Sequence, residues 1–295
     1  MDIAKYLEDM KNMVNIALDE YLRPKADIPK ILIEAMRYSV LAGGKRLRPI
    51  LCLASGQVLG GRIETILPVA CAIELIHTYS LIHDDLPAID NDDFRRGKLS
   101  NHKMFGEDMA IAAGDCLLTY AFELISSSYT DGKVRPELAL RLVQEISTAA
   151  GITGMVAGQV VDIKSTSKEL DKNVLQYIHT HKTGALITAS VRTGAMVAGA
   201  TAQELEALTN YAKNIGLAFQ IVDDLLDVVG DKKKLGKTVG KDSEQKKMTY
   251  VSVYGARKAD QIARQKIAAA NNSLSQFKEP DLLIQIADFI VKRQS

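Results

Sequence analysis

The chain has 295 residues, 47% of them hydrophobic, which is ample for a sizeable core. Its 37 basic and 36 acidic residues give a formal charge of +1, so no overall field favours nucleic acid or an anionic membrane. Any anion-binding site must therefore be built locally. The three cysteines lie far apart among apolar residues, which favours buried thiols in a reducing compartment over a disulfide framework or a zinc site.

The first residues mix charged and apolar side chains and lack the basic start and apolar run of a secretory signal. We also expect no membrane span, because no stretch approaches the run of about 18 apolar residues that a transmembrane helix needs. Both observations predict a cytoplasmic protein without stable membrane insertion.

Apolar residues recur at spacings of three and four through most of the chain, which predicts an all-α protein. The seven prolines are far apart, and few segments alternate with period two. No linker or repeat appears, so we expect one domain over residues 1–295 with about ten helices. The predicted helices are Tyr6–Leu22, Ile31–Ala42, Leu51–Leu59, Leu67–Ile82, Ala110–Ser126, Glu137–Ala157, Leu175–Ala198, Glu204–Val229, Met248–Leu274 and Leu282–Lys292.

Glycines and prolines mark some of the boundaries between these helices. Gly43 and Gly44 can adopt the positive φ that ends a helix, and Pro87 stops the helix that runs up to the acidic residues after Ile82. Gly154 and Gly158 are four residues apart, which predicts a close contact between helices.

An acidic cluster follows the fourth predicted helix, in the segment His83–Asp93, where five of the residues are aspartates. Taken alone, an acidic helix end is most often a solvated loop. The spacing does not fit a calcium loop of the EF-hand kind, because a loop starting at Asp90 would need glycine at Arg95 and glutamate at Asn101.

A second acidic cluster lies inside an otherwise apolar helix and is more informative. Gln220, Asp223 and Asp227 are spaced by three and four residues and project from one face. Buried carboxylates need positive partners. If the clusters face each other, six carboxylates surround one cavity: Asp84, Asp85, Asp90, Asp223, Asp224 and Asp227. Such a set of hard oxygen ligands favours Mg²⁺ and a metal-bridged di- or triphosphate.

Basic residues follow both acidic clusters and precede the first. They are Lys45, Arg48, Arg95, Arg96, Lys182, Lys237 and Lys241. Each one alone is most often a solvated cation, but together they suit phosphates held partly through metal and partly by direct bonds. Two separate basic sets predict two diphosphates, one of them bound without metal. His77 lies on nearly the same helical face as Asp84 and is either part of the metal-free set or a structural histidine.

Five motifs, in order and spacing, resemble those of the trans-isoprenyl diphosphate synthases, most closely the bacterial farnesyl diphosphate synthases. They are GGKRLRP, SLIHDDLPAIDNDDFRRG, HKTGALI, GLAFQIVDDLLD and LGKTVGKD, between Ile31 and Lys241. The resemblance implies a prenyltransferase of the isoprenoid synthase fold, with mostly antiparallel helices around a deep central cavity. It also implies a homodimer.

The resemblance further implies roles for individual residues. Asp84, Asp85 and Asp90 hold Mg²⁺ against an allylic diphosphate, and Asp223 and Asp227 hold a further ion, with three Mg²⁺ per active site. Lys45, Arg48, His77 and Arg96 bind isopentenyl diphosphate, whereas Arg95, Lys182, Thr183, Gln220 and Lys237 bind the allylic substrate. The expected catalytic residues are Asp84, Asp85, Asp90, Lys182, Asp223 and Lys237.

The implied reaction condenses isopentenyl diphosphate with dimethylallyl or geranyl diphosphate to give farnesyl diphosphate. Tyr79, with Ser80 beside it, is expected to limit chain length, and a geranylgeranyl diphosphate synthase is the alternative within the family. Two other classes of protein fit the sequence less well. A terpene cyclase has little use for a second diphosphate site, and a non-catalytic partner subunit does not need both acidic motifs intact.

Overall fold

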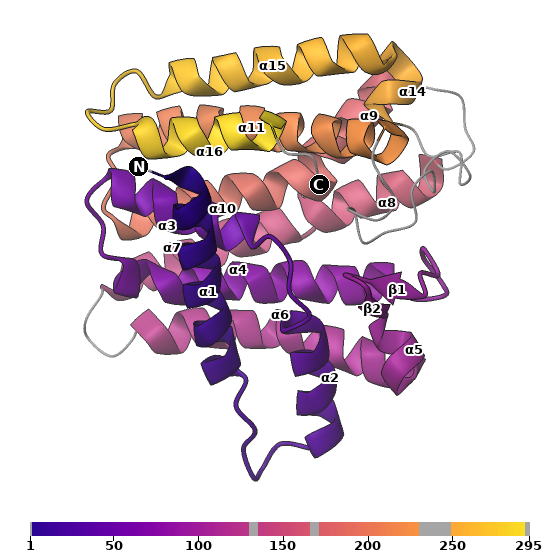
Figure 1. The fold of residues 1–295 in the computed structure, drawn as a ribbon. Coiled ribbons are helices and arrows are strands. Elements are labelled where there is room, and N and C mark those ends of the chain that lie inside the picture. Colours follow the sequence, from indigo (N-terminus) through magenta and orange to yellow (C-terminus); the bar gives the residue numbers. More distant parts are fainter. Residues whose placement is uncertain (1, 130–134, 166–170, 230–248, 293–295) are drawn as a thin grey trace.

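The computed structural model describes residues 2–129, 135–165, 171–229 and 249–292, and within these ranges the chain is almost entirely helical (Figure 1). The helices are α1 (Ile3–Tyr21), α2 (Lys30–Val40), α3 (Leu47–Val58), α4 (Ile63–Asp84), α5 (Asn101–Phe105), α6 (Glu107–Tyr129), α7 (Pro136–Ala150), α8 (Met155–Ser165), α9 (Lys172–Ile178), the π-helix η1 (His179–Gly184), α10 (Ala185–Val197), α11 (Ala202–Val229), α14 (Tyr250–Tyr254), α15 (Ala256–Ser273) and α16 (Asp281–Lys292). Strands β1 (Phe94–Arg95) and β2 (Lys98–Leu99) form a small antiparallel hairpin. The predicted all-α class is confirmed.

The long helices run along a common direction, and α1 and α2 cross them (Figure 1). Helix α4 lies in the middle, in contact with α3, α6 and α10. Most of its residues are buried, as its apolar sequence on all sides predicts. The hairpin, α8, α9 and α14 gather at one end of the bundle, at the right in Figure 1. The charged residues at the end of α4 therefore lie where these shorter elements meet.

Helix α10 is held very close to α3. A Cβ atom at Gly194 would lie 1.9 Å from the carbonyl oxygen of Cys52, so only glycine permits this approach. Ser55 Oγ donates a hydrogen bond to the carbonyl oxygen of Val191, 2.8 Å away. Because η1 leads directly into α10, these contacts also position the residues of η1.

Three predicted helices are interrupted in the structure. Glu137–Ala157 is broken by a turn over residues 151–154, and Met248–Leu274 begins at Tyr250 and is broken at Gly255, whose φ is +77°. Leu175–Ala198 contains the π-helix η1. The β-hairpin was not predicted, because two-residue strands are too short to show a period-two pattern. Its turn residues Arg96 and Gly97 both have positive φ (53° and 76°), as a two-residue type I′ turn requires.

Among the described residues, three helical segments, the third of them α7 and α8 with the turn between them, are long and apolar enough to cross a membrane by length and composition alone, which corrects the expectation that no such segment exists. They are Ile63–Asp84, Glu107–Ser128 and Pro136–Ser165. In the first, 67% of an apolar stretch of 18 residues is buried inside the protein, compared with 39% and 28% of the corresponding stretches in the other two. The core thus accounts for the hydropathy of α4, whereas α6, α7 and α8 keep apolar side chains at the surface.

Candidate active site

The end of α4, the hairpin, η1 and α11 bring together most of the residues singled out in the sequence. Lys182 and Asp84 interact electrostatically across η1 and α4, and Arg48 and Asp223 do so across α3 and α11. The two acidic motifs and the basic residues therefore belong to one region. Lys237 and Lys241 lie outside the described residues.

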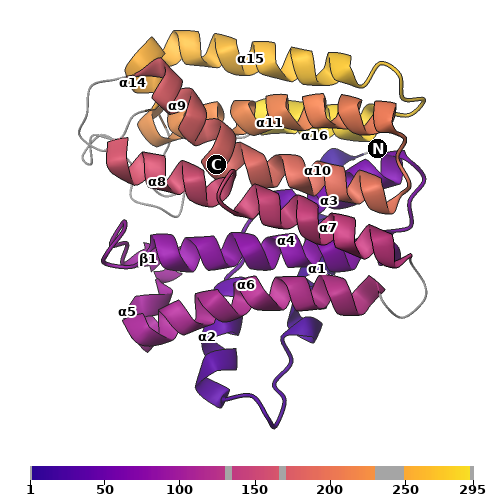
Figure 2. The ribbon, with the colours of Figure 1, turned by 180° about the vertical axis from the view of Figure 1, so that it is seen from behind.

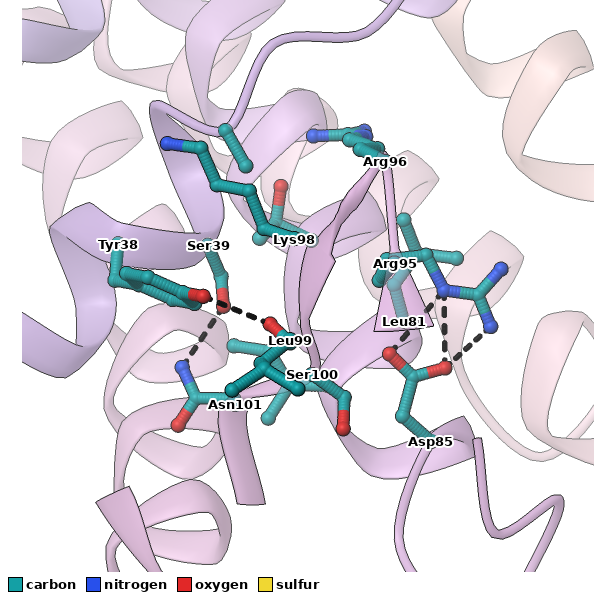
Figure 3. A pocket seen from close by; sticks show the side chains of 13 residues that line it. Tyr38, Ser39, Leu81, Asp85, Arg95, Arg96, Lys98, Leu99, Ser100 and Asn101 are labelled. Atoms are coloured by element: carbon teal, nitrogen blue, oxygen red, sulfur yellow. Dashed lines mark hydrogen bonds and ion pairs between the residues drawn. The ribbon is translucent and has the colours of Figure 1, made fainter. Parts of the chain in front are cut away.

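Asp85 and Arg95 form a tight ion pair at the end of α4 (Figure 3). Arg95 Nε donates to both carboxylate oxygens at 3.0 and 3.2 Å, Nη2 also contacts Oδ1, and Nη2 reaches Asp92 Oδ2 at 3.1 Å. Burial raises the pKa of Asp85, although Arg95 opposes that shift. The pair borders a cavity of about 20 Å³, which has room for about one water molecule but not for a prenyl chain.

Asp84, one residue earlier, lies among several charged groups. Burial raises the pKa of its carboxyl to about 6; Lys182 lowers this pKa, and the nearby carboxylate of Asp90 raises it further. The backbone N–H of Asp90 donates to the carbonyl oxygen of Asp84 at 2.9 Å, which folds the acidic loop back onto the helix end. Asp84 is thus a carboxylate whose charge is only partly compensated by the protein itself.

Lys182 lies in η1, and its Nζ contacts Asp162 Oδ2 of α8 at 2.6 Å. Although burial lowers the pKa of Lys182, Asp162 and Asp84 raise it more. Asp162 was not predicted from the sequence. In the sequence, Asp162 is marked only by its position four residues after Gly158. The structure shows why Gly158 is a glycine: a Cβ atom there would lie 2.2 Å from the backbone nitrogen of Lys182.

The predicted close contact at Gly158 is therefore confirmed, and it joins α8 to η1. The prediction for Gly154 was wrong. A Cβ atom there would meet the carbonyl oxygen of Ala149 at 2.0 Å, within the turn that follows α7. Near Lys182, Gln159 Oε1 is buried without a hydrogen-bond partner. π-helical turns are rare and often occur at functional sites, as η1 does here.

A chain of hydrogen bonds links η1 to α11 and α14. Thr183 Oγ1 donates to Gln220 Oε1 at 2.9 Å, and Gln220 Nε2 donates to Asp224 Oδ1 at 3.2 Å. Asp224 Oδ2 accepts the backbone N–H of Tyr250 at 2.7 Å. The hypothesis of six carboxylates around one cavity is thus corrected, since Asp224 is buried and links α14 to α11. Adjacent residues on a helix point about 100° apart, so Asp224 faces different neighbours from Asp223. Asp223 and Asp227 remain partly exposed on α11.

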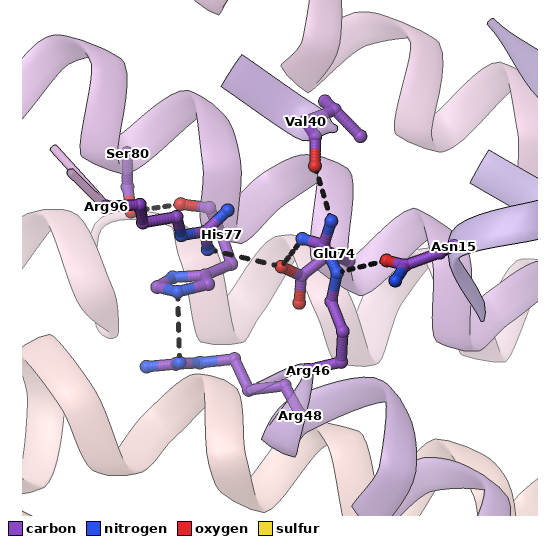
Figure 4. A network of polar contacts seen from close by, with 8 residues as sticks. All are labelled: Asn15, Val40, Arg46, Arg48, Glu74, His77, Ser80 and Arg96. Atoms are coloured by element: carbon purple, nitrogen blue, oxygen red, sulfur yellow. Dashed lines mark hydrogen bonds and ion pairs between the residues drawn. The ribbon is translucent and has the colours of Figure 1, made fainter. Parts of the chain in front are cut away.

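A second group of cations lies between α3, α4 and the hairpin (Figure 4). Arg48 Nη1 is 3.4 Å from His77 Nε2. Burial lowers the pKa of His77 well below its ordinary value, and the positive charge of the neighbouring arginines lowers it further, so this imidazole is neutral. Arg96 completes the group, and Lys45 lies beside it at the surface. Two residues here, Arg46 and Glu74, were missed by the sequence analysis.

Tyr79 is buried on α4, with its ring edge-on to the ring of His83 and the two ring centroids 5.7 Å apart. Burial raises the pKa of Tyr79, and the charge of Asp84 adds to this shift, which shows that the ring lies near the acidic motif. Ser80 Oγ donates to the carbonyl oxygen of His77 at 2.9 Å. Tyr79 therefore lies near the acidic motif, whereas the Ser80 hydroxyl is bound to its own helix, and a role of either residue in chain length stays a prediction.

The described residues contain no group of three carboxylate, histidine or cysteine side chains close enough to hold a metal ion in this arrangement. The donors nevertheless fit a hard cation. Asp84 is half-buried and Asp85 is buried, both carboxyls have raised pKa values, and cationic side chains already lie against them or near them. Oxygen ligands without thiol or imidazole partners suit Mg²⁺.

An all-α bundle that carries carboxylates at the end of one central helix, with two groups of cations around them, defines the isoprenoid synthase class. The family model of the polyprenyl synthetases matches residues 29–287, and the chain belongs to this family. The predicted membership is thus confirmed, and the chain is a prenyltransferase.

Similar proteins agree on the family and differ in the product they are named for. The chain is 47% identical over 274 residues to the farnesyl diphosphate synthase of Geobacillus stearothermophilus, covering 93% of this chain and 92% of that protein. It is 44% identical over 296 residues to the geranylgeranyl diphosphate synthase of Cyanophora paradoxa, covering 100% and 97%. A solved FPP/GFPP synthase structure from Zymomonas mobilis matches with a TM-score of 0.85 and 37% identity, covering 98% of this chain and 99% of that one.

The raised pKa of Asp84 predicts that this residue destabilises the ligand-free protein. Its pKa in the folded protein, about 6, lies above the ordinary value of 3.8, so folding favours the protonated form. The free energy of unfolding should then fall as pH rises from about 4 to about 6, by up to about 3 kcal/mol. We expect Asp84→Asn to raise the melting temperature by a few degrees at pH 7.5 and to have no such effect near pH 4.

Thermal unfolding without metal or substrate, followed by circular dichroism, checks this expectation. The matched control is Asp9→Asn, since Asp9 is exposed on α1. A gain that is equal at both pH values, or a loss of stability at pH 7.5, would contradict it.

Proposed function

We propose that the chain is a Mg²⁺-dependent farnesyl diphosphate synthase, which adds isopentenyl diphosphate to dimethylallyl and then geranyl diphosphate. The observation that carries this proposal is the presence of two separate groups of cations. Arg95 and Lys182 interact with carboxylates, which suits a diphosphate bound together with metal. Arg48 and Arg96 lie beside neutral His77, which suits a diphosphate bound directly. A cytoplasmic location remains a prediction from the sequence.

In this proposal Asp84, Asp85, Asp90, Asp223 and Asp227 hold Mg²⁺, three ions in all, which supplies positive charge against the departing diphosphate. Arg95 and Lys182 bind the oxygens of that diphosphate and stabilise the charge that develops when the allylic C–O bond breaks. Thr183, which follows Lys182 in η1, is hydrogen-bonded to Gln220, and in this proposal both residues orient the allylic substrate.

The second substrate is held by Lys45, Arg48, His77 and Arg96, so that its double bond faces the allylic carbon. Attack by this double bond forms the new C–C bond, and the proton then lost from the adjacent carbon goes to the released diphosphate. The protein supplies no nucleophile. Apolar residues of α4 keep water from the carbocation.

Product length is the finer part of the proposal. Tyr79 lies five positions before Asp84, about 7.5 Å along a helix, so the growing chain meets its ring after a few isoprene units. Farnesyl diphosphate, with fifteen carbons, is the product we favour. Geranylgeranyl diphosphate is the alternative, because relatives of both names match this chain along most of its length.

The proposed homodimer would use the apolar face of α6, α7 and α8; in Figure 2 α7 and α8 follow each other end to end, and α6 is in contact with α7. Its exposed side chains include Ile111, Leu140, Ile152, Val156, Val160 and Ile163. Ile152 is 91% exposed. Contiguous apolar surface is costly in a monomer, and a second copy that presents the same face covers it with two-fold symmetry.

The function is tested with purified protein, Mg²⁺, isopentenyl diphosphate and either dimethylallyl or geranyl diphosphate. After dephosphorylation we expect a fifteen-carbon alcohol from both primers, and we expect EDTA to abolish its formation. A twenty-carbon product would favour the geranylgeranyl alternative. Conversion of geranyl diphosphate without isopentenyl diphosphate would point to a cyclase, and no condensation by a folded protein would point to a partner subunit.

Tyr79→Ala should lengthen the product to twenty carbons or more, because it removes the ring that the chain meets. The measurement is the same product assay with geranyl diphosphate as primer. Tyr120→Ala is the matched control, since the Tyr120 hydroxyl donates to the carbonyl oxygen of Tyr21 on α1. An unchanged profile for Tyr79→Ala would exclude this residue as the limit of chain length.

The double change Ile152→Asp and Val160→Asp should convert the dimer to a monomer, because it places charges in the apolar face. Light scattering after size-exclusion chromatography at micromolar concentration measures the mass. Ile16→Asp, on α1, is the control, since Ile16 is 65% exposed but lies on a different helix. A wild-type monomer, or a dimer that survives the double change, would contradict this interface.

A further inference from the structure

The group of cations that lies apart from the acidic motifs contains one buried carboxylate, Glu74 of α4 (Figure 4). The side chain of Glu74 is 1% exposed, so its charge must be met within the protein. Its Oε1 accepts from Arg46 Nη1 at 2.6 Å and from Arg96 Nη2 at 3.5 Å. A single oxygen therefore links the loop before α3 to the turn of the hairpin.

Each of the three nitrogens of the Arg46 guanidinium has a hydrogen-bond partner within the protein. Its side chain is 0% exposed, and besides Glu74 it donates from Nε to Asn15 Oδ1 at 2.9 Å and from Nη2 to the carbonyl oxygen of Val40. Its backbone has a φ of 51°, a left-handed conformation that is unfavourable for a residue with a Cβ. Arg46 therefore cannot reach a substrate. Its buried charge and its fixed backbone set the positions of its neighbours Lys45 and Arg48.

Arg96 approaches the same place from the hairpin. A Cβ at Gly44 would lie 2.9 Å from Arg96 Cζ, so the guanidinium packs directly on the backbone of the glycine pair. Its own backbone also has positive φ, 53°. Glu74 is the acceptor that the structure gives to this guanidinium. Without that bond, the direction of Arg96 would depend on van der Waals contact alone.

Arg48 differs from Arg46 because it keeps unused capacity for hydrogen bonding. Its Nε is buried without a partner, and its Nη1 faces the neutral ring of His77. Arg46, Arg48 and Arg96 carry three positive charges, and the carboxylates that act on them are Glu74, bonded to Arg46 and Arg96, and Asp223 of α11, which interacts with Arg48 without a hydrogen bond between them. Because Arg46 is bonded to Glu74 and cannot be reached, a dianionic group would be bound by Arg48 and Arg96.

We propose that Glu74 is a positioning residue for the metal-free diphosphate: it fixes Arg46 and Arg96 so that Arg48, Arg96 and Lys45 converge on one ligand. The inference rests on the proposed function, because it takes isopentenyl diphosphate as that ligand. Glu74 touches no substrate and acts through the arginines. Asn15, on α1 and outside every motif, supports the same geometry through Arg46.

The test is binding of isopentenyl diphosphate in EDTA, measured by calorimetry, together with steady-state kinetics in Mg²⁺. Glu74→Gln keeps the shape of the side chain and removes its charge. We expect its Kd and KM for isopentenyl diphosphate to rise about tenfold, as the loss of a charged hydrogen bond implies, with KM for geranyl diphosphate and kcat within about threefold. Asn15→Ala should raise the same Kd about threefold.

Glu145→Gln is the matched control, since Glu145 pairs with Arg192 at 2.6 Å between α7 and α10, away from this group. A kcat lowered with both KM values unchanged would show that Glu74 only supports the fold and would overturn the inference. If Glu74→Gln does not fold, an unchanged Kd for Asn15→Ala overturns it. A wild-type protein that fails to bind isopentenyl diphosphate in EDTA would instead refute the metal-free site in the proposed function.

Discussion

The burial of charge on α4 is the constraint on which the rest of the site depends. This helix is surrounded by other helices, yet it carries Glu74, Asp84 and Asp85. Each buried carboxylate costs several kcal/mol, roughly, unless a cation meets it. Arg46 meets Glu74, Arg95 meets Asp85, and Lys182 partly compensates Asp84. The loop before α3, the hairpin and η1 take their positions around α4 for this reason.

The same pairing gives the cations around the acidic motifs carboxylate partners within the protein. Arg95 and Lys182 are bonded to carboxylates of the protein itself, and in the proposed reaction they bind a diphosphate. In that reaction metal ions would compete with Arg95 and Lys182 for carboxylate oxygens, and the diphosphate would compete with these carboxylates for the two cationic side chains. Around Glu74, by contrast, three arginines lie close to one buried carboxylate, which is why we propose that a diphosphate binds there without metal.

Much of the fold and part of the site could be predicted because their signals are local. The spacing of apolar residues was enough to predict most of the helices. The spacing of Gln220, Asp223 and Asp227 was likewise enough to predict that they share one face of a helix. The partners of Lys182 and Arg46 could not be found in this way, since Asp162 and Glu74 are distant in sequence and isolated among apolar residues. Asp224 was grouped with Asp223 because they are adjacent, although a helix turns them to different neighbours. The π-helix and the interruption at Gly255 depend on backbone geometry that no periodicity reveals.

The type I′ turn of the hairpin has a consequence for how the two substrates are arranged. Arg95 ends a strand and points to Asp85, whereas Arg96 occupies the left-handed turn and points to Glu74. Two consecutive residues thus face the two proposed diphosphate sites, and their Cα atoms are about 3.8 Å apart across one trans peptide. In the proposed reaction the hairpin would therefore fix the spacing between the two substrates. A displacement of the hairpin would move Arg95 and Arg96 together, so the spacing of the two diphosphates would be kept even when the end of the bundle shifts.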